Sequence, residues 1–193
     1  MGVELSMKVE KIITDYFNNA RRYSNTLENQ KEEIIKIANI IKKSNTIFIC
    51  GNGGSSAMAS HMANDFQKVC GLRAICLTDN IPLITAWSND DSYDNIFERQ
   101  LETLSLINGN KLNDTIILIT GSGNSENLIK AAKWSLKYNR YVIAFIGLNG
   151  GKLFKMGGIN KIHIQSDMYH TENWHCMLDH LLVILIGNEN DNR

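Results

Sequence analysis

The chain of 193 residues is long enough for one domain with a sizeable hydrophobic core. It carries 20 lysine and arginine residues against 20 aspartate and glutamate residues, so its formal net charge of +0 gives no argument for nucleic acid as a partner. No apolar run reaches membrane-spanning length and the N-terminus lacks a secretory signal, so the 4 cysteines, which form no C-x-x-C pair, fit a reduced, cytoplasmic setting.

Apolar residues at helical spacing predict two helices before the first strand, one over residues 3–23 and one that begins at Asn25-Thr26. Thr26 and Asn29 are candidate caps for the second helix. Two helices are more than a small sheet needs. Subunit contact is one use for them, and a helical layer within a single chain is the other.

Five apolar segments alternate with helical stretches along the rest of the chain. The predicted strands are Thr46–Cys50, Ala74–Thr78, Asp114–Ile119, Arg140–Ile146 and Lys161–Gln165. The predicted helices between and after them are Ser56–Lys68, a helix opened by Pro82, Tyr93–Leu106, Glu126–Tyr138, a short one within 148–158, and Thr171 to about Ile186. This alternation predicts a single α/β domain over residues 1–193, with a parallel sheet and helices on both faces.

The first predicted strand ends in the glycine-rich turn Gly51-Asn52-Gly53-Gly54-Ser55, and a helix follows. Free backbone N–H groups and the positive end of the helix favour an anion at such a turn. Ser55 adds a hydroxyl group and can cap the helix. The turn lacks the spacing of a P-loop or a dinucleotide turn, so a plain strand–helix turn is the alternative.

A second turn of the same kind follows the third predicted strand, where residues 115–125 read TIILITGSGNS. Thr120, Ser122 and Ser125 supply three hydroxyl groups there. Ligands of parallel α/β folds bind beyond the carboxyl ends of the strands, and both turns lie at such ends. The two turns therefore predict a site for a phosphate monoester, with a pair of serine-capped helices as the alternative.

Together GNGGSS and TGSGNS resemble the sugar isomerase (SIS) domain, and the resemblance covers nearly the whole chain. His61, Asp65 and the late segment with Glu172, His175 and His180 make it similar to the phosphoheptose isomerase family. The resemblance implies a three-layer sandwich around a five-stranded, flavodoxin-like parallel sheet. It also implies a homotetramer built with an N-terminal helical hairpin (1–44) on a core (45–193), with sites at subunit interfaces.

The resemblance implies an aldose–ketose isomerase that converts sedoheptulose 7-phosphate to D-glycero-D-manno-heptose 7-phosphate through an enediol, for heptose in lipopolysaccharide or capsule. Asp65 would be the carboxylate acid/base and His180 its partner. Without the resemblance, we would interpret His180 as a core histidine and Asn89-Asp90-Asp91 as a helix cap or turn. The turns and the resemblance together give these substrate-binding residues: Asn52, Gly53, Gly54, Ser55, Asp65, Asn89, Asp90, Thr120, Gly121, Ser122, Ser125 and Glu172.

The same side chains also suggest a metal. Some phosphoheptose isomerases hold zinc, and the matching positions here are His61, Asp65, Glu172 and His180. Residue 65 is usually glutamate in the family and residue 172 usually glutamine, so this chain departs twice. Two carboxylates would repel each other without a metal and bind a cation more tightly with one. We therefore expect Zn²⁺, one ion per site.

Other functions fit the same fold. A non-catalytic SIS protein that binds a sugar phosphate or a replication initiator is one alternative, and an isomerase of another phosphosugar is a second. The retained His61, Asp65 and His180 weigh against the first. His175 is either near the site or only packed, and Lys68 and Lys152 are either phosphate contacts or solvated surface lysines.

Overall fold

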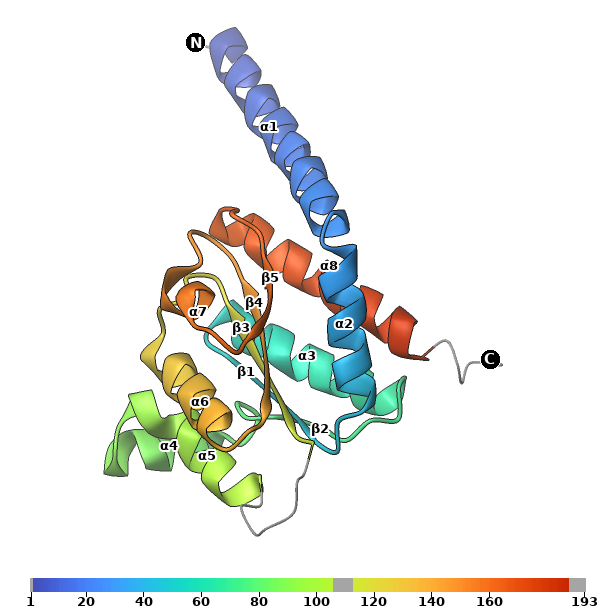
Figure 1. Cartoon of the computed structure of the whole chain (residues 1–193). Helices are drawn as coiled ribbons and strands as arrows, with labels where there is room; N and C mark the ends of the chain where they lie inside the picture. The colour runs from blue at the N-terminus through green and yellow to red at the C-terminus, as the bar shows by residue number, and fades with distance from the viewer. Residues whose placement is uncertain (1, 106–112, 188–193) are drawn as a thin grey trace.

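The computed structural model describes residues 2–105 and 113–187, which form a parallel sheet between two layers of helices (Figure 1). The strands are β1 (Ile47–Gly51), β2 (Ala74–Cys76), β3 (Thr115–Thr120), β4 (Tyr141–Ile146) and β5 (Asn160–His163). The helices are α1 (Gly2–Glu28), α2 (Lys31–Lys42), α3 (Gly54–Lys68), α4 (Ile81–Asp90), η1 (Tyr93–Asn95), α5 (Ile96–Leu104), α6 (Glu126–Lys137), α7 (Gly151–Lys155) and α8 (Met168–Gly187). The predicted three-layer α/β fold is confirmed.

The sheet has the strand order β2-β1-β3-β4-β5, and every pair in it is parallel. After β1 the chain adds β2 on one side and then crosses back to add β3 on the other. The winding direction therefore reverses between β1 and β3. In doubly wound sheets a ligand crevice lies at this switch point, beyond the carboxyl ends of the strands.

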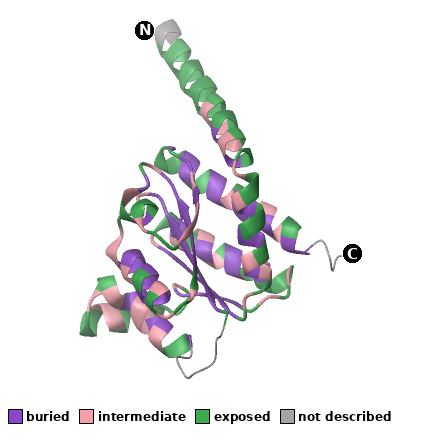
Figure 2. Ribbon diagram, viewed as in Figure 1, coloured by how far each residue is buried: buried purple, intermediate pink, exposed green. Residues whose placement is uncertain are grey.

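Two apolar clusters, one on each face, hold the sheet between its helices. Successive strand residues point to opposite faces, so Ile47 and Ile49 of β1 join one cluster while Phe48 and Cys50 join the other. The first cluster packs under α2, α3 and α8, and the second under α5, α6 and α7. Figure 2 shows the strands buried between these layers, as a parallel sheet with near-continuous apolar strands requires.

Helix α1 projects away from the body of the protein (Figure 1). The predicted hairpin over residues 1–44 is not formed, because α2 continues onward from α1 and does not fold back along it. The second helix also begins at Lys31, later than predicted. The hydroxyl of Thr26 donates to the carbonyl of Arg22 within α1, a bond 3.0 Å long, so Thr26 does not cap α2.

The junction between α1 and α2 is tied to the edge of the sheet by Gln30. Its side-chain amide donates to the carbonyl oxygen of His163 at 3.0 Å and accepts from the backbone N–H of His163 at 3.3 Å. A second tie lies about four helical turns earlier, where the ring of the buried His170 contacts the carbonyl of Tyr16 at 3.0 Å. The carboxyl-terminal part of α1 is therefore fixed to the body while its first turns are exposed.

Other element ends differ from expectation in ways that local hydrogen bonds explain. Helix α8 begins at Met168, before the predicted Thr171, whose hydroxyl donates to the Asp167 carbonyl at 2.7 Å inside the helix. Pro82 lies in the first turn of α4 as predicted, with Asn80 as the cap. The predicted helix end at Leu106 lies outside the described residues. Among those described, no helix is both long and apolar enough to span a membrane.

We predict that Gly51→Ala destabilises the protein by about 1–3 kcal/mol, as overpacking does. A Cβ atom at residue 51 would lie 2.6 Å from the backbone oxygen of Ser55, which cannot move without shifting α3. Gly157→Ala is the control, because its added Cβ meets no atom within 4 Å. Urea unfolding should show a change within about 0.5 kcal/mol for the control. Equal losses in both variants would contradict this account of the turn.

Candidate functional site

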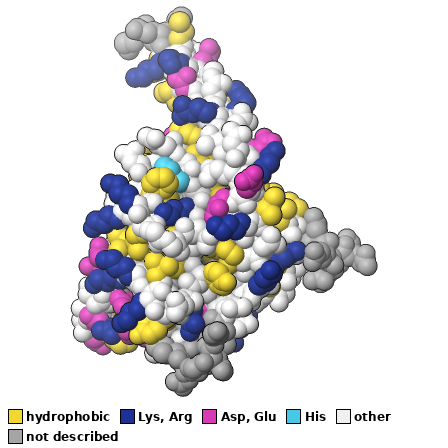
Figure 3. Space-filling model, in the orientation of Figure 1, with side chains coloured by type: hydrophobic (Ala, Val, Ile, Leu, Met, Phe, Trp, Pro, Cys, Tyr) yellow, Lys and Arg dark blue, Asp and Glu magenta, His cyan; other side chains and the backbone are white. Residues whose placement is uncertain are grey.

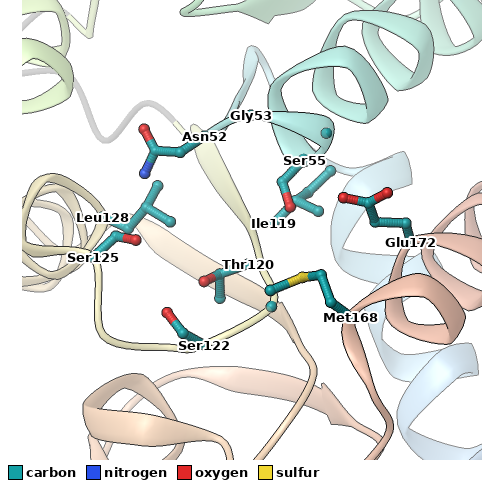
Figure 4. A pocket seen from close by; sticks show the side chains of 12 residues that line it. Asn52, Gly53, Ser55, Ile119, Thr120, Ser122, Ser125, Leu128, Met168 and Glu172 are labelled. Atoms are coloured by element: carbon teal, nitrogen blue, oxygen red, sulfur yellow. The ribbon is translucent and has the colours of Figure 1, made fainter.

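The two glycine–serine turns lie side by side at the switch point of the sheet. Gly51 pairs with Ile119 across β1 and β3, so the two strands end at the same level and their turns face each other. Figure 4 shows the hydroxyl groups of both turns around one hollow. The hollow is lined by Asn52, Gly53, Gly54, Ser55, Ile119, Thr120, Gly121, Ser122, Ser125, Leu128, Met168 and Glu172.

The first turn directs the start of α3 at this hollow. Gly53 takes a left-handed backbone conformation with φ of 58° and is the residue that precedes the helix. The backbone N–H of Ser55 donates to the Asn52 carbonyl at 3.1 Å. Ser55 lies within the first turn of α3 and does not cap it, so its hydroxyl remains available to a ligand. The start of a 15-residue helix adds partial positive charge there.

The second turn is held in shape by its own side chains. Thr120 accepts a hydrogen bond from the Gly123 N–H at 3.1 Å, and Ser122 accepts one from the Asn124 N–H at 3.2 Å. Ser125 precedes α6 but its side chain makes no capping bond. Its hydroxyl therefore adds a free donor beside the start of α6, a second helix directed at the hollow.

An amide pair that the sequence analysis did not single out joins the two turns. Asn52 and Asn127 exchange two side-chain hydrogen bonds, each 3.0 Å long. The hydroxyl of Tyr93 donates to the side-chain oxygen of Asn52 at 2.8 Å. Asn127 is in the first turn of α6, so this pair fixes α6 against the turn after β1. The sequence signal for this pair was Asn127, a polar residue on an otherwise apolar face of the predicted helix.

Glu172 reaches the same hollow from α8. A Cβ atom at residue 54 would lie 2.2 Å from a carboxylate oxygen of Glu172, so Gly54 leaves the space that this side chain occupies. Figure 4 shows the Glu172 carboxylate directed toward Ser55. Glu172 therefore adds an acceptor of hydrogen bonds to a rim otherwise rich in donors.

A group of histidine and aspartate side chains lies along the seam between α3 and α8. One ligand atom from each of His61, Asp65, Asp179 and His180 lies within 4.8 Å of all the others. The Nε2 atom of His61 is 3.2 Å from Nε2 of His180 and 3.4 Å from an oxygen of Asp65. The structure thus brings together three of the four predicted metal positions.

Glu172 does not belong to this group within one chain. It precedes His180 by eight residues in α8, which is about 12 Å along a helix axis. Asp179 occupies the place of the fourth residue, and the sequence analysis missed it. The available signal was a carboxylate inside the apolar run LDHLLVIL, next to His180.

Asp179 is fully buried, and neither of its carboxylate oxygens has a hydrogen-bond partner among the described residues. Burial and, to a smaller extent, the negative charge of Asp65 raise the pKa of Asp179 to about 7, while His61 opposes the shift. The Nε2 atom of His61 is 3.8 Å from a carboxylate oxygen of Asp179.

The donor types in this group fit a divalent cation. Imidazole nitrogens and carboxylate oxygens are both ligands of Zn²⁺ and of neighbouring transition metals. A buried carboxylate without a hydrogen-bond partner is also stabilised by a coordinated cation. We conclude that His61, Asp65, Asp179 and His180 form a group that could hold a metal.

Two predicted sugar contacts do not line the hollow. Asn89 and Asp90 lie at the end of α4, where the Asn89 side-chain amide donates to Asp90 at 2.8 Å. The neighbouring Asp91 is bound by Arg99 at 2.8 Å, which orients the cluster toward α5. Asn89 and Asp90 therefore do not line this hollow in the single chain, and their contact with the sugar stays a prediction.

The two candidate lysines do not line the hollow either. Lys152 forms an ion pair with Glu126, 3.5 Å long, and Lys68 lines a separate depression with Ser60 and Asp79. On the face shown in Figure 3, acidic side chains lie among the lysine and arginine side chains. The visible face therefore carries side chains of both charges.

His175 packs in the core of the protein. It is fully buried, with ring centroids 4.1 Å from Trp174 and 6.4 Å from Phe145. Burial lowers the pKa of His175 to about 3, against a smaller opposing effect of the Phe145 backbone. His175 is therefore a neutral packing residue, the second of the two predicted roles.

Known proteins resemble this chain in both sequence and structure. A family model described as the SIS domain matches residues 15–147. The phosphoheptose isomerase of Aliarcobacter butzleri is 32% identical over 187 residues, which cover 92% of this chain and 96% of that protein. The phosphoheptose isomerase of Aquifex aeolicus is 36% identical over 164 residues, or 80% and 83% of the two chains.

A solved structure adds the same likeness in three dimensions. The phosphoheptose isomerase of Neisseria gonorrhoeae superimposes with a TM-score of 0.83 at 27% identity, over 93% of this chain and 99% of that one. The match extends over the sheet and both helical layers, so the fold described above is that of this solved enzyme.

We predict that His175 makes the protein lose stability as pH falls below 6.5. The pKa of His175 is about 6.5 in the unfolded chain and about 3 in the folded protein. Between these two pH values only the unfolded chain binds the proton, so acid favours the unfolded state. The expected loss is about 1.4 kcal/mol per pH unit in this window. Urea unfolding of wild type and His175→Gln should give a shallower pH dependence for the variant. Parallel curves would contradict a buried neutral histidine.

Proposed function

Because the chain belongs to the SIS-domain phosphoheptose isomerase family, we propose that it converts sedoheptulose 7-phosphate to D-glycero-D-manno-heptose 7-phosphate. The observation that carries this proposal is the pairing of two kinds of site. Two hydroxyl-rich turns meet at the switch point, and a carboxylate–imidazole group lies farther along the two helices that leave it. A sugar phosphate needs the first, and an aldose–ketose isomerisation needs the second.

The phosphate group of the substrate binds between the two turns. The hydroxyls of Ser55, Ser122 and Ser125 donate to its oxygens, together with backbone N–H groups at the starts of α3 and α6. Thr120 holds the second turn in shape through its bond from Gly123. Glu172, an acceptor on the rim, binds sugar hydroxyl groups, since a carboxylate would repel the phosphate itself.

Asp65 and His180 move the protons of the reaction. Asp65 takes a proton from C1 of the open-chain ketose while His180 gives a proton to the oxygen on C2, which yields the enediol. His180 then takes the proton from the oxygen on C1, and Asp65 returns its proton to C2, which yields the aldose. No atom is gained or lost.

His61, Asp65 and His180 would also hold the metal, for which we propose Zn²⁺. When bound, Zn²⁺ supplies a Lewis acid that stabilises negative charge on the sugar oxygens. Asp65 is one methylene shorter than the glutamate usual in the family, so its carboxylate lies closer to α3 than a glutamate carboxylate would. Glu172 could reach this group only from a second copy of the chain, because its own copy lies two helical turns away.

We propose that second copies complete the site in a homotetramer. Side chains of His61 and His180 are exposed in the single chain, where His61 keeps 47% of its side-chain surface accessible. The projecting part of α1 exposes these large apolar residues: Leu5, Met7, Val9, Ile12, Ile13, Tyr16 and Phe17. A long helix with an exposed apolar face is stabilised when another surface packs against that face. In a homotetramer, another subunit provides this surface.

The cytoplasm is the proposed compartment, and heptose for lipopolysaccharide or capsule the proposed use. The four cysteines, Cys50, Cys70, Cys76 and Cys176, are free thiols, as expected in a reducing compartment. The phosphorylated substrate is consistent with the same compartment.

The proposed reaction is tested by following purified protein with sedoheptulose 7-phosphate by NMR, with and without a chelator and added zinc. Appearance of the aldose heptose phosphate supports the assignment, and its loss in chelator supports a required metal. Absence of turnover in every condition, with the sugar phosphate still bound, would support a non-catalytic binding protein. Turnover of another ketose phosphate alone would assign a different substrate.

We predict that His180→Ala lowers turnover by about 10²–10⁴-fold, because one partner of the proton transfer is removed. His163→Ala is the matched control. That histidine lies on β5 and contacts the Leu148 carbonyl at 3.1 Å, outside the site. The control should turn over nearly as wild type does, and gel filtration should give the same oligomer for all three proteins. A fully active His180→Ala variant would exclude this mechanism.

We predict that Ile12→Glu with Phe17→Glu dissociates the oligomer. The two side chains are 59% and 55% exposed on α1, so the change does not disturb the core of the single chain. Lys8→Glu, on the same helix, changes charge without removing an apolar group and is the control. Light scattering after gel filtration should show smaller particles only for the double variant. A tetramer that survives would place the subunit contact elsewhere.

A further inference from the structure

We propose that Asp179 is a direct ligand of the metal, completing a site with His61, Asp65 and His180 of the same chain. The assignment rests on the metal role in the proposed function and extends it to a residue outside the predicted ligand set. It leaves Glu172 free to bind the sugar.

The positions of the donor atoms fit one tetrahedral ion. Bonds of about 2.1 Å place neighbouring ligand atoms about 3.4 Å apart in a tetrahedral zinc site. The Nε2 atom of His61 lies 3.2 Å from His180, 3.4 Å from Asp65 and 3.8 Å from Asp179. All four donor atoms lie within 4.8 Å of one another, so small side-chain rotations close the set.

Asp179 has the environment of a metal ligand. Its side chain has no exposed surface, and neither oxygen finds a hydrogen-bond partner among the described residues. Buried carboxylates are ordinarily paired, hydrogen-bonded or bound to a metal. Two imidazoles and two carboxylates would together bring two negative charges to a divalent cation, which leaves the group neutral.

The direction of Asp179 argues for direct coordination. A carboxylate that only orients a metal-bound histidine contacts the ring nitrogen that is not bound to the metal. Asp179 approaches Nε2 of His61, the same nitrogen that faces Asp65 and His180. Its carboxylate therefore shares the space of the ion with the other three donors.

Glu172 is the competing carboxylate, and position separates the two. Asp179 directly precedes His180, whereas Glu172 lies about 12 Å away along α8 and fills the space above Gly54. One chain therefore contains a complete four-residue set without Glu172.

The experiment measures zinc binding directly, by competition with a chromophoric chelator after the protein has been stripped of metal. Asp179→Asn should bind Zn²⁺ about 100-fold more weakly or worse, since even outer-shell substitutions cost about 10–100-fold. Glu172→Gln is the matched control, as it also removes one carboxylate charge from α8, and it should keep the wild-type affinity. Gel filtration confirms that every variant has the wild-type assembly.

A second variant tests contact with the metal even if Asp179→Asn folds poorly. Asp179→Cys substitutes a thiolate, which is itself a zinc and cobalt ligand. With Co²⁺ bound, it should show a sulfur-to-cobalt charge-transfer absorption that wild type and Glu172→Gln lack. That band appears only if the side chain at position 179 touches the ion.

Two outcomes would overturn the inference. One is an Asp179→Asn protein whose zinc affinity stays within tenfold of wild type, and the other is an Asp179→Cys protein with Co²⁺ bound and no new band. Turnover of sedoheptulose 7-phosphate is measured separately. Wild-type protein that binds zinc through Asp179 but turns over no sugar would refute the proposed function and leave this ligand assignment standing.

Discussion

Parallel pairing of β1 with β3 is the constraint on which the site depends. It ends two strands at one level, at the place where the chain reverses its winding direction, and so brings two turns from distant parts of the sequence together. The exchange of hydrogen bonds between Asn52 and Asn127 then fixes the distance between them. Glycine at residue 51 lets the first turn close against the start of α3. The proposed anion site rests on these backbone features, with hydroxyl groups as additions.

The histidine–aspartate group depends on a second consequence of the same arrangement. Helices α3 and α8 both pass the hollow, where Gly54 and Glu172 meet, and they stay in contact farther along. His61 and His180 follow those residues by similar distances along their helices, and so they meet across the seam. Helix geometry thus sets the spacing between the proposed phosphate site and the proposed acid/base group at roughly two turns of helix.

Much of this could be predicted from the sequence because the signals were local. Continuous apolar runs bounded by turn residues located all five strands to within one or two residues at most ends, and glycine with serine located the turns. What was missed depended on contacts between distant segments. In the sequence, Asp179 only interrupts an apolar helix. The structure shows that His61 and Asp65 lie beside it. The course of α2, which continues onward from α1, likewise had no local signal in the sequence.

Gln30 has a consequence for how the sheet behaves in crowded solution. An outermost strand offers unpaired backbone donors and acceptors, which can template the addition of a strand from another molecule. Gln30 occupies one donor and one acceptor of His163, so it takes the place of a neighbouring strand at the carboxyl end of the outer edge of β5. The side chain of Gln30 thus also protects the single chain, before it assembles with other copies, against edge-to-edge aggregation.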